Sequence, residues 1–120
     1  VLRMYAIDGG NDTKCSEFKG KNGSVADMEV QNKTRLLAVP GFDFDNATAE
    51  SISNAISASN ITSNKINPFV VGDIIAFKTV DTSTAGGGRI GVMKILSDTQ
   101  VVSNNPTARI ITVSIKLPKK

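Results

Sequence analysis

The stretch Gly72-Asp73-Ile74-Ile75-Ala76-Phe77-Lys78-Thr79-Val80 and the later stretch Arg89-Ile90-Gly91-Val92-Met93-Lys94-Ile95-Leu96 decide the fold class of this chain. The residues between them are rich in Asp, Thr, Ser and Gly, which favour turns. A third run, residues 108–117, alternates apolar and polar residues as a half-buried strand does. The three runs predict three successive strands of an antiparallel sheet.

The remainder of the chain adds two shorter strands and one helix to this expectation. The strands are expected at residues 1–7 and 34–39, and each is followed by turn residues. Asp45 or Asn46 is expected to cap a helix of about residues 46–59, while residues 60–68 are expected to form a polar connector. The predicted fold class is therefore α+β, mainly an antiparallel sheet with one amphipathic helix packed on one face.

Hydrophobic periodicity also predicts the core. Apolar residues of the helix recur at helical spacing, and those of the last strand recur at every second position. The pattern places both sets on facing surfaces of the helix and the sheet. The predicted core comprises Ile52, Ile56, Ile75, Phe77, Ile111, Val113 and Ile115.

Length and composition indicate one domain that covers residues 1–120. The sequence opens at Val1 without an initiator methionine or an apolar leader, which predicts a trimmed part of a longer exported protein. No apolar run approaches the length of a membrane-spanning helix. The net charge of +3 comes from dispersed basic residues and aromatics make up only 5%, so nucleic acid is not an expected partner.

The residue inventory assigns no catalytic, cofactor-binding or metal-binding residue, and the chain is predicted not to be an enzyme. With no histidine and with Cys15 as the only cysteine, neither a zinc ligand set nor a Ser-His-Asp triad can be assembled. Two clusters of oxygen ligands, residues 8–12 and 43–46, lack the spacing of a calcium loop and are interpreted as turns and caps. A carboxylate pair created only by folding, with Asp43 and Asp45 as the candidates, stays open as a route to catalysis.

The run Gly86-Gly87-Gly88-Arg89-Ile90-Gly91 satisfies the G-x-G-x-x-G pattern of dinucleotide-binding proteins. That pattern binds a pyrophosphate at the N-terminus of a helix, whereas these glycines lead into a strand. We interpret the run as a hairpin loop.

Several segments resemble those of uncharacterised secreted or lipoprotein domains of Bacteroidetes bacteria. The resemblance rests on Gly72-Asp73-Ile74-Ile75-Ala76-Phe77-Lys78-Thr79, on Gly91-Val92-Met93-Lys94-Ile95, on Asn32-Lys33-Thr34-Arg35 and on Phe42-Asp43-Phe44-Asp45. It spans about residues 32–117. It implies an extracellular or cell-surface location, with or without a lipid anchor in the full-length protein, and it carries over no catalytic residue.

The expected function is that of a non-enzymatic extracellular module that binds a protein or a glycan through the loops at residues 8–31 and 81–89. The alternative is an accessory domain of a polysaccharide-degrading or proteolytic enzyme whose catalytic residues lie outside this chain. A glycan-binding surface would need exposed aromatic rings. The chain offers six candidates for that role: Tyr5, Phe18, Phe42, Phe44, Phe69 and Phe77.

Overall fold

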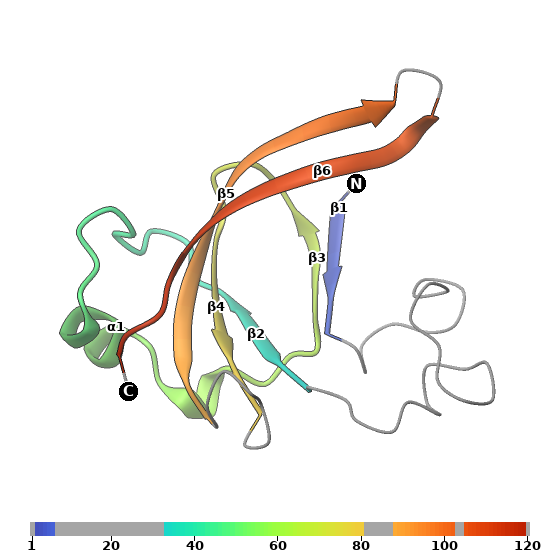
Figure 1. Cartoon of the computed structure of the whole chain (residues 1–120). Helices are drawn as coiled ribbons and strands as arrows, with labels where there is room; N and C mark the ends of the chain where they lie inside the picture. Colours follow the sequence, from blue (N-terminus) through green and yellow to red (C-terminus); the bar gives the residue numbers. More distant parts are fainter. Residues whose placement is uncertain (1, 7–32, 81–87, 103–104, 120) are drawn as a thin grey trace.

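Figure 1 shows the computed structural model of the chain, which describes residues 2–6, 33–80, 88–102 and 105–119. The fold class is confirmed, because the described residues form a mainly antiparallel β-structure with one α-helix. In chain order the elements are β1 (Leu2–Tyr5), β2 (Arg35–Ala38), α1 (Ala49–Ala55), the short 3₁₀ helix η2 (Ala58–Asn60), β3 (Lys65–Phe69), β4 (Ile74–Lys78), β5 (Ile90–Val102) and β6 (Asn105–Lys116).

The strands form two antiparallel sheets. One sheet has the spatial order β2-β4-β5-β6, and the other pairs β1 with β3. The β5–β6 hairpin is the longest pairing, and Figure 1 shows its far half extending beyond the other strands. Among the described strands β6 pairs only with β5, so it forms one edge of the larger sheet.

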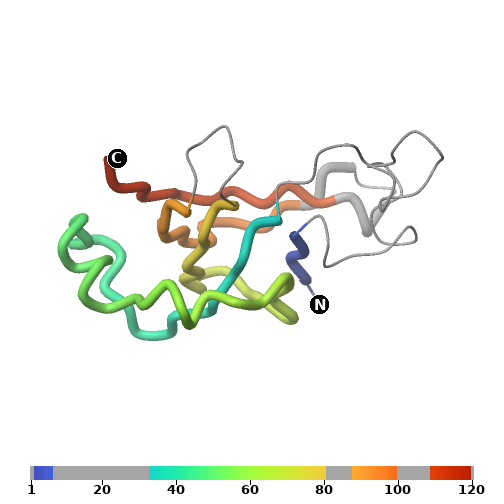
Figure 2. The backbone as a smooth tube through the Cα atoms, turned by 90° about the horizontal axis from the view of Figure 1, so that it is seen from below, coloured from blue at the N-terminus to red at the C-terminus, as the bar shows by residue number. Residues whose placement is uncertain are grey.

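The four-stranded sheet lies between two layers, and each layer closes one hydrophobic core. In Figures 1 and 2 the segment that contains α1 lies on one side of this sheet and β1 lies on the other. The first core, here called the helix-side core, consists of Phe44, Ile52, Ile56, Ile61, Ala76 and Val92. The second, the small-sheet core, consists of Leu36, Phe69, Ile75, Phe77 and Ile95.

These two cores correct the predicted packing. Ile52, Ile56, Ile75 and Phe77 are buried as expected. However, alternation along β4 sends Ile75 and Phe77 to the small-sheet core, whereas the helix packs over Ala76 on the opposite face. The prediction that the core residues of the sheet face the helix was wrong for Ile75 and Phe77, because the β1–β3 sheet covers the face of β4 that carries them.

The last strand departs from the prediction at one position. Ile111 and Val113 are half-buried and pack against the small-sheet core. Ile115 was placed in the core by its period, but 55% of its surface is exposed. The alternation of residues along a strand shows which face of the sheet a side chain occupies, but not whether that face is covered. An edge strand such as β6 has a neighbouring strand on one side only, so some of its inward-facing side chains stay exposed.

The helix is shorter than expected and begins later. Its N-cap is Thr48, so the prediction of Asp45 or Asn46 was wrong. The Thr48 side chain accepts a hydrogen bond from Ser51 N (3.1 Å), and Ser51 Oγ accepts one from Thr48 N (2.9 Å). This reciprocal capping box fixes the start of α1, and the helix ends at Ala55 because Ile56 adopts an extended conformation with its side chain buried.

The expected connector at residues 60–68 contains a strand, β3, that the sequence analysis missed. Pro68 argued against a strand here, because proline has no backbone N–H to donate to a neighbouring strand and occurs in sheets only at edges and irregularities. The β1–β3 pairing is irregular between Leu2 and Met4, opposite Asn67 and Pro68. At that point Arg3 Nε donates to Asn67 Oδ1 (3.2 Å).

Candidate functional site

A groove of about 560 Å³ on the described surface lies between residues 39–46 and α1. Two smaller grooves of about 420 and 340 Å³ lie beside the opposite flank of α1 and beside the β3–β4 turn. Binding sites for small ligands typically have volumes of about 300–1,000 Å³. The lining of the 560 Å³ groove comprises Val39, Pro40, Gly41, Phe42, Asp43, Asn46, Ser51, Ala55 and Ile56.

A tight turn at residues 39–42 forms the first wall of this groove. Val39 N donates to Ile74 O (2.9 Å), so the turn starts where β2 leaves β4, and Phe42 N donates to Val39 O (3.2 Å). Pro40 suits the second position of such a turn, and Gly41 adopts the positive φ of 81° that the third position requires. The chain direction into Phe42 is therefore set by local backbone chemistry.

The next four residues, Phe42-Asp43-Phe44-Asp45, alternate between the core and the solvent. Phe44 is buried, and Phe42 is half-buried against the helix-side core while also lining the groove. Asp43 and Asp45 are exposed. Alternation of this kind holds the backbone of the loop against the core and presents its carboxylates outward.

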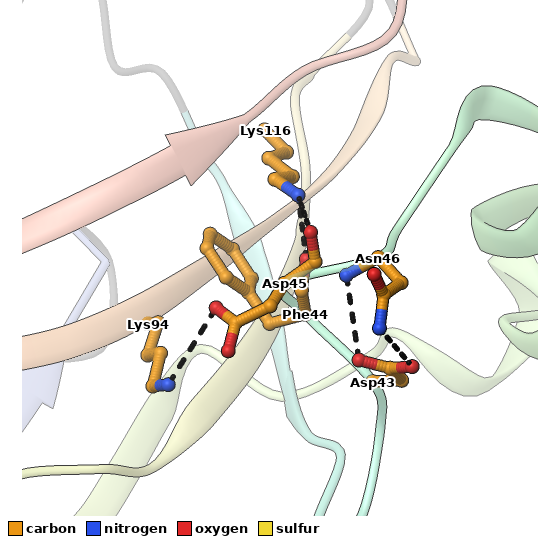
Figure 3. Close-up of polar contacts among 6 residues, drawn as sticks. All are labelled: Asp43, Phe44, Asp45, Asn46, Lys94 and Lys116. Carbon is orange, nitrogen blue, oxygen red and sulfur yellow. Dashed lines mark hydrogen bonds and ion pairs between the residues drawn. The ribbon is translucent and has the colours of Figure 1, made fainter.

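Two lysines of the larger sheet fasten this loop, as Figure 3 shows. Lys116 Nζ donates to Phe44 O (2.6 Å) and to Asp45 O (3.0 Å), and it lies 4.9 Å from the centre of the Phe44 ring. Lys94 Nζ lies 3.8 Å from Asp45 Oδ1. The Lys116 contacts are the stronger anchor, because exposed ion pairs such as Lys94–Asp45 contribute little.

The carboxylate of Asp43 has a different partner and a different orientation. Asn46 donates to it twice, from Nδ2 to Oδ2 (3.0 Å) and from the backbone N to Oδ1 (3.4 Å). In Figure 3 the Asp45 side chain points toward Lys94 and the Asp43 side chain points toward Asn46. Folding thus directs these two carboxylates to separate partners, and only Asp43 lines the groove.

The other described aspartates also contact the fold. Asp73 Oδ2 accepts a hydrogen bond from Val70 N (2.9 Å). On the β5–β6 hairpin Arg109 Nε donates to Asp98 Oδ1 (2.8 Å), and this bond raises the pKa of Arg109. In the part of the chain that the structure describes, no three His, Cys, Asp or Glu side chains group together as metal ligands. The same part contains no helix of the length and apolarity that crossing a membrane requires.

Several candidates from the sequence lie outside the described residues. These are Cys15, the cluster at residues 8–12, the loop at residues 8–31 and residues 81–87 of the second loop. Of the glycine motif, Gly91 is in β5, where an added Cβ would lie 2.6 Å from Phe77 Cζ. Gly91 thus permits close packing, in agreement with the prediction that the motif leads into a strand.

Three of the six aromatic candidates are core residues: Phe44, Phe69 and Phe77. Phe42 is half-buried and lines the groove. From the sequence the 43–46 cluster was interpreted as turns and caps, with Asp43 and Asp45 left open as a carboxylate pair, and the groove beside it was not predicted. The Pro40-Gly41 turn, directly before alternating phenylalanines and aspartates, was the sequence signal for the first wall of the groove. The second wall could not be predicted in this way, because the position of α1 against this loop depends on tertiary packing.

Comparison of the chain with protein-family models, curated proteins and solved structures found no match.

Proposed function

We propose that this chain is a non-enzymatic extracellular module that binds a protein or a glycan, and that the groove between residues 39–46 and α1 is its binding surface. The observation that carries the proposal is the fastening of both groove walls. Val39 is bonded to β4, Lys116 of β6 holds the backbone of Phe44 and Asp45, and the Thr48 capping box fixes α1. Binding sites built on such fixed walls lose little conformational entropy when a ligand binds.

The contacts of the described aspartates support the non-enzymatic part of the proposal. Asp43 is bonded to Asn46, Asp45 lies beside Lys94, Asp73 accepts from Val70 N and Asp98 is paired with Arg109. A general acid or base acts on a substrate proton that lies within hydrogen-bond reach. These carboxylates instead form hydrogen bonds within turns and ion pairs on the surface.

The predicted loops at residues 8–31 and 81–89 stay part of the proposal as additional binding surface. The groove adds a surface whose residues are described. The location outside the cell is supported by the sequence resemblance alone.

A groove-blocking variant tests the binding proposal. Ala55 is exposed and lines the groove from α1, so Ala55→Trp would fill it, whereas the adjacent exposed Asn54 does not line it. We would screen the wild type, Ala55→Trp and Asn54→Trp against a glycan array and a random-peptide display library. Binding that Ala55→Trp abolishes and Asn54→Trp retains is expected. Binding that survives in both variants would refute the groove as the binding surface.

The non-enzymatic part needs its own assay. The purified chain is expected to show no turnover of a panel of glycosides, esters and peptides. The matched variant changes both Asp43 and Asp45 to Asn. Turnover by the wild type that disappears in this double variant would make the two carboxylates catalytic and overturn the proposal.

A further inference from the structure

We infer that the ligand of this groove is a neutral sugar, with Phe42 under its apolar face and with Asp43 and Asn46 bonded to its hydroxyl groups. The inference rests on the groove proposed above as the binding surface. The evidence for it is that an aromatic residue, a carboxylate and an amide, namely Phe42, Asp43 and Asn46, line the same groove.

The aromatic component is Phe42. Phe42 is half-buried, packs against the helix-side core and lines the groove. The face of an aromatic ring carries partial negative charge and attracts polarised C–H groups. A pyranose ring offers a flat patch of such C–H groups on one side, so it suits a partly exposed phenyl ring.

The polar component is the pair Asp43 and Asn46. An ionised carboxylate has about four acceptor positions, and Asn46 occupies two of those on Asp43 through its side chain and its backbone N–H. The remaining positions can accept hydrogen bonds from hydroxyl groups. Asn46 adds a carbonyl oxygen that accepts and a second amide hydrogen that donates, and neighbouring sugar hydroxyls need this combination of donor and acceptor.

The charge at the groove favours a neutral ligand over an anionic one. Asp43 is the only charged residue of the groove lining and would repel an anion. The two lysines of Figure 3 contact Asp45 and the backbone carbonyls of Phe44 and Asp45, on the side of the loop away from the Asp43–Asn46 pair. They are therefore poorly placed to bind an anion in the groove.

An extended peptide fits this surface less well than a sugar. A peptide would gain most by pairing with a free strand edge beside the groove, and β2 is the nearest end strand of the sheet. Leu36 N of β2 already donates to Ser63 O (2.7 Å), and Val39 N donates to Ile74 O. The free edge of β2 is thus already bonded at Leu36, which leaves only a short stretch of this edge beside the groove for a peptide to pair with.

The experiment measures the affinity for neutral oligosaccharides by NMR titration of the labelled chain with cellotetraose, mannotetraose, galactotetraose and chitotetraose. Phe42→Leu keeps apolar volume but removes the ring, and Asp43→Ala removes the acceptors. Each is expected to weaken binding of the recognised sugar about tenfold. Asp45→Ala, on the same loop but outside the groove lining, is the matched control and should change affinity less than about twofold.

Retained thermal unfolding of each variant shows that it is folded, and Ala55→Trp blocks the groove from α1 if a loop variant fails to fold. Sugar binding that the groove variants leave unchanged would overturn the inference. If no oligosaccharide binds but a library peptide binds and Ala55→Trp abolishes that binding, the sugar assignment fails while the proposed function stands. If neither sugars nor peptides bind in a groove-dependent way, both proposals fail.

Discussion

Strands β4 and β6 both carry large apolar side chains, but these side chains lie in different environments. In β4 the consecutive residues Ile75, Ala76 and Phe77 are all buried. In β6 Ile110 and Ile115 remain 53% and 55% exposed. The difference follows from position, because β4 lies between β2 and β5 and is covered on both faces, whereas β6 ends the sheet.

The apolar side chains of a strand thus stabilise the fold only where another layer of structure packs against them. β4 has one layer on each face: α1 with residues 39–46 on one, and the β1–β3 pair on the other. The far half of the β5–β6 hairpin extends beyond those layers (Figure 1). Substitutions in β4 should therefore cost much more stability than similar substitutions in β6.

The largest expected effect belongs to Phe77→Ala. Removing this buried ring opens a cavity in the small-sheet core and should lower the free energy of unfolding by about 3–5 kcal/mol. Urea denaturation followed by circular dichroism measures the loss. Ile115→Ala in β6 is the control and should cost no more than about 1 kcal/mol. Equal losses for the two variants would contradict the contrast between the strands.

A smaller effect is expected at Gly91 of β5, where an added Cβ would meet both Phe77 of β4 and Lys116 of β6. A Cβ there would lie 2.6 Å from Phe77 Cζ and 2.9 Å from Lys116 O. Because a side chain and a backbone carbonyl would both have to shift, Gly91→Ala should destabilise the fold by about 1–3 kcal/mol.

A double-mutant cycle with Phe77→Leu tests this explanation of Gly91. The shorter leucine should relieve the contact with the ring but leave the contact with the Lys116 carbonyl. Gly91→Ala is thus expected to cost less in the Phe77→Leu background than in the wild type. Strict additivity of the two changes would show that the ring is not what Gly91 accommodates.

The contrast between β4 and β6 also explains how far the sequence predicts this fold. The runs around β2, β4, β5 and β6 were recognised because β-branched and aromatic residues lie between turn residues. Which face each residue occupies needs knowledge of the layers. The small sheet that covers Ile75 and Phe77 includes β3, which was not predicted as a strand because it contains Pro68 and polar residues.

The groove was less predictable than the sheet. Pro40 and Gly41 predict a turn from local sequence alone, and Asp43 and Asn46 are typical turn residues. Their meeting with Ser51 and Ala55 depends on where α1 begins, and the expected cap was Asp45 or Asn46, not Thr48. Thr48 prevails because Ser51 completes a reciprocal pair of hydrogen bonds, while Asn46 is bonded to Asp43.

The capping box of α1 allows a test of one layer over β4 alone, because its hydrogen bonds join Thr48 and Ser51 at the start of the helix. Thr48→Ala leaves Ser51 N without its acceptor and should cost about 1 kcal/mol. Thr48→Ser keeps the hydroxyl and should restore most of that loss. In hydrogen exchange, the amides of α1 should lose protection in Thr48→Ala while those of the β5–β6 hairpin keep theirs. A uniform loss across the sheet would mean that the helix and β6 unfold as one unit.

The smallest effect is expected for Ile115→Thr. The side chain is 55% exposed on an edge strand, and threonine keeps the β-branched shape that strands favour. The change in the free energy of unfolding should therefore stay within about 0.5 kcal/mol. Val113→Thr, two residues earlier on the same face, places a hydroxyl against the small-sheet core and should cost about 1 kcal/mol. If Ile115→Thr were the more damaging of the two, Ile115 would have to be covered in solution, and the exposed end of β6 would be part of an interface.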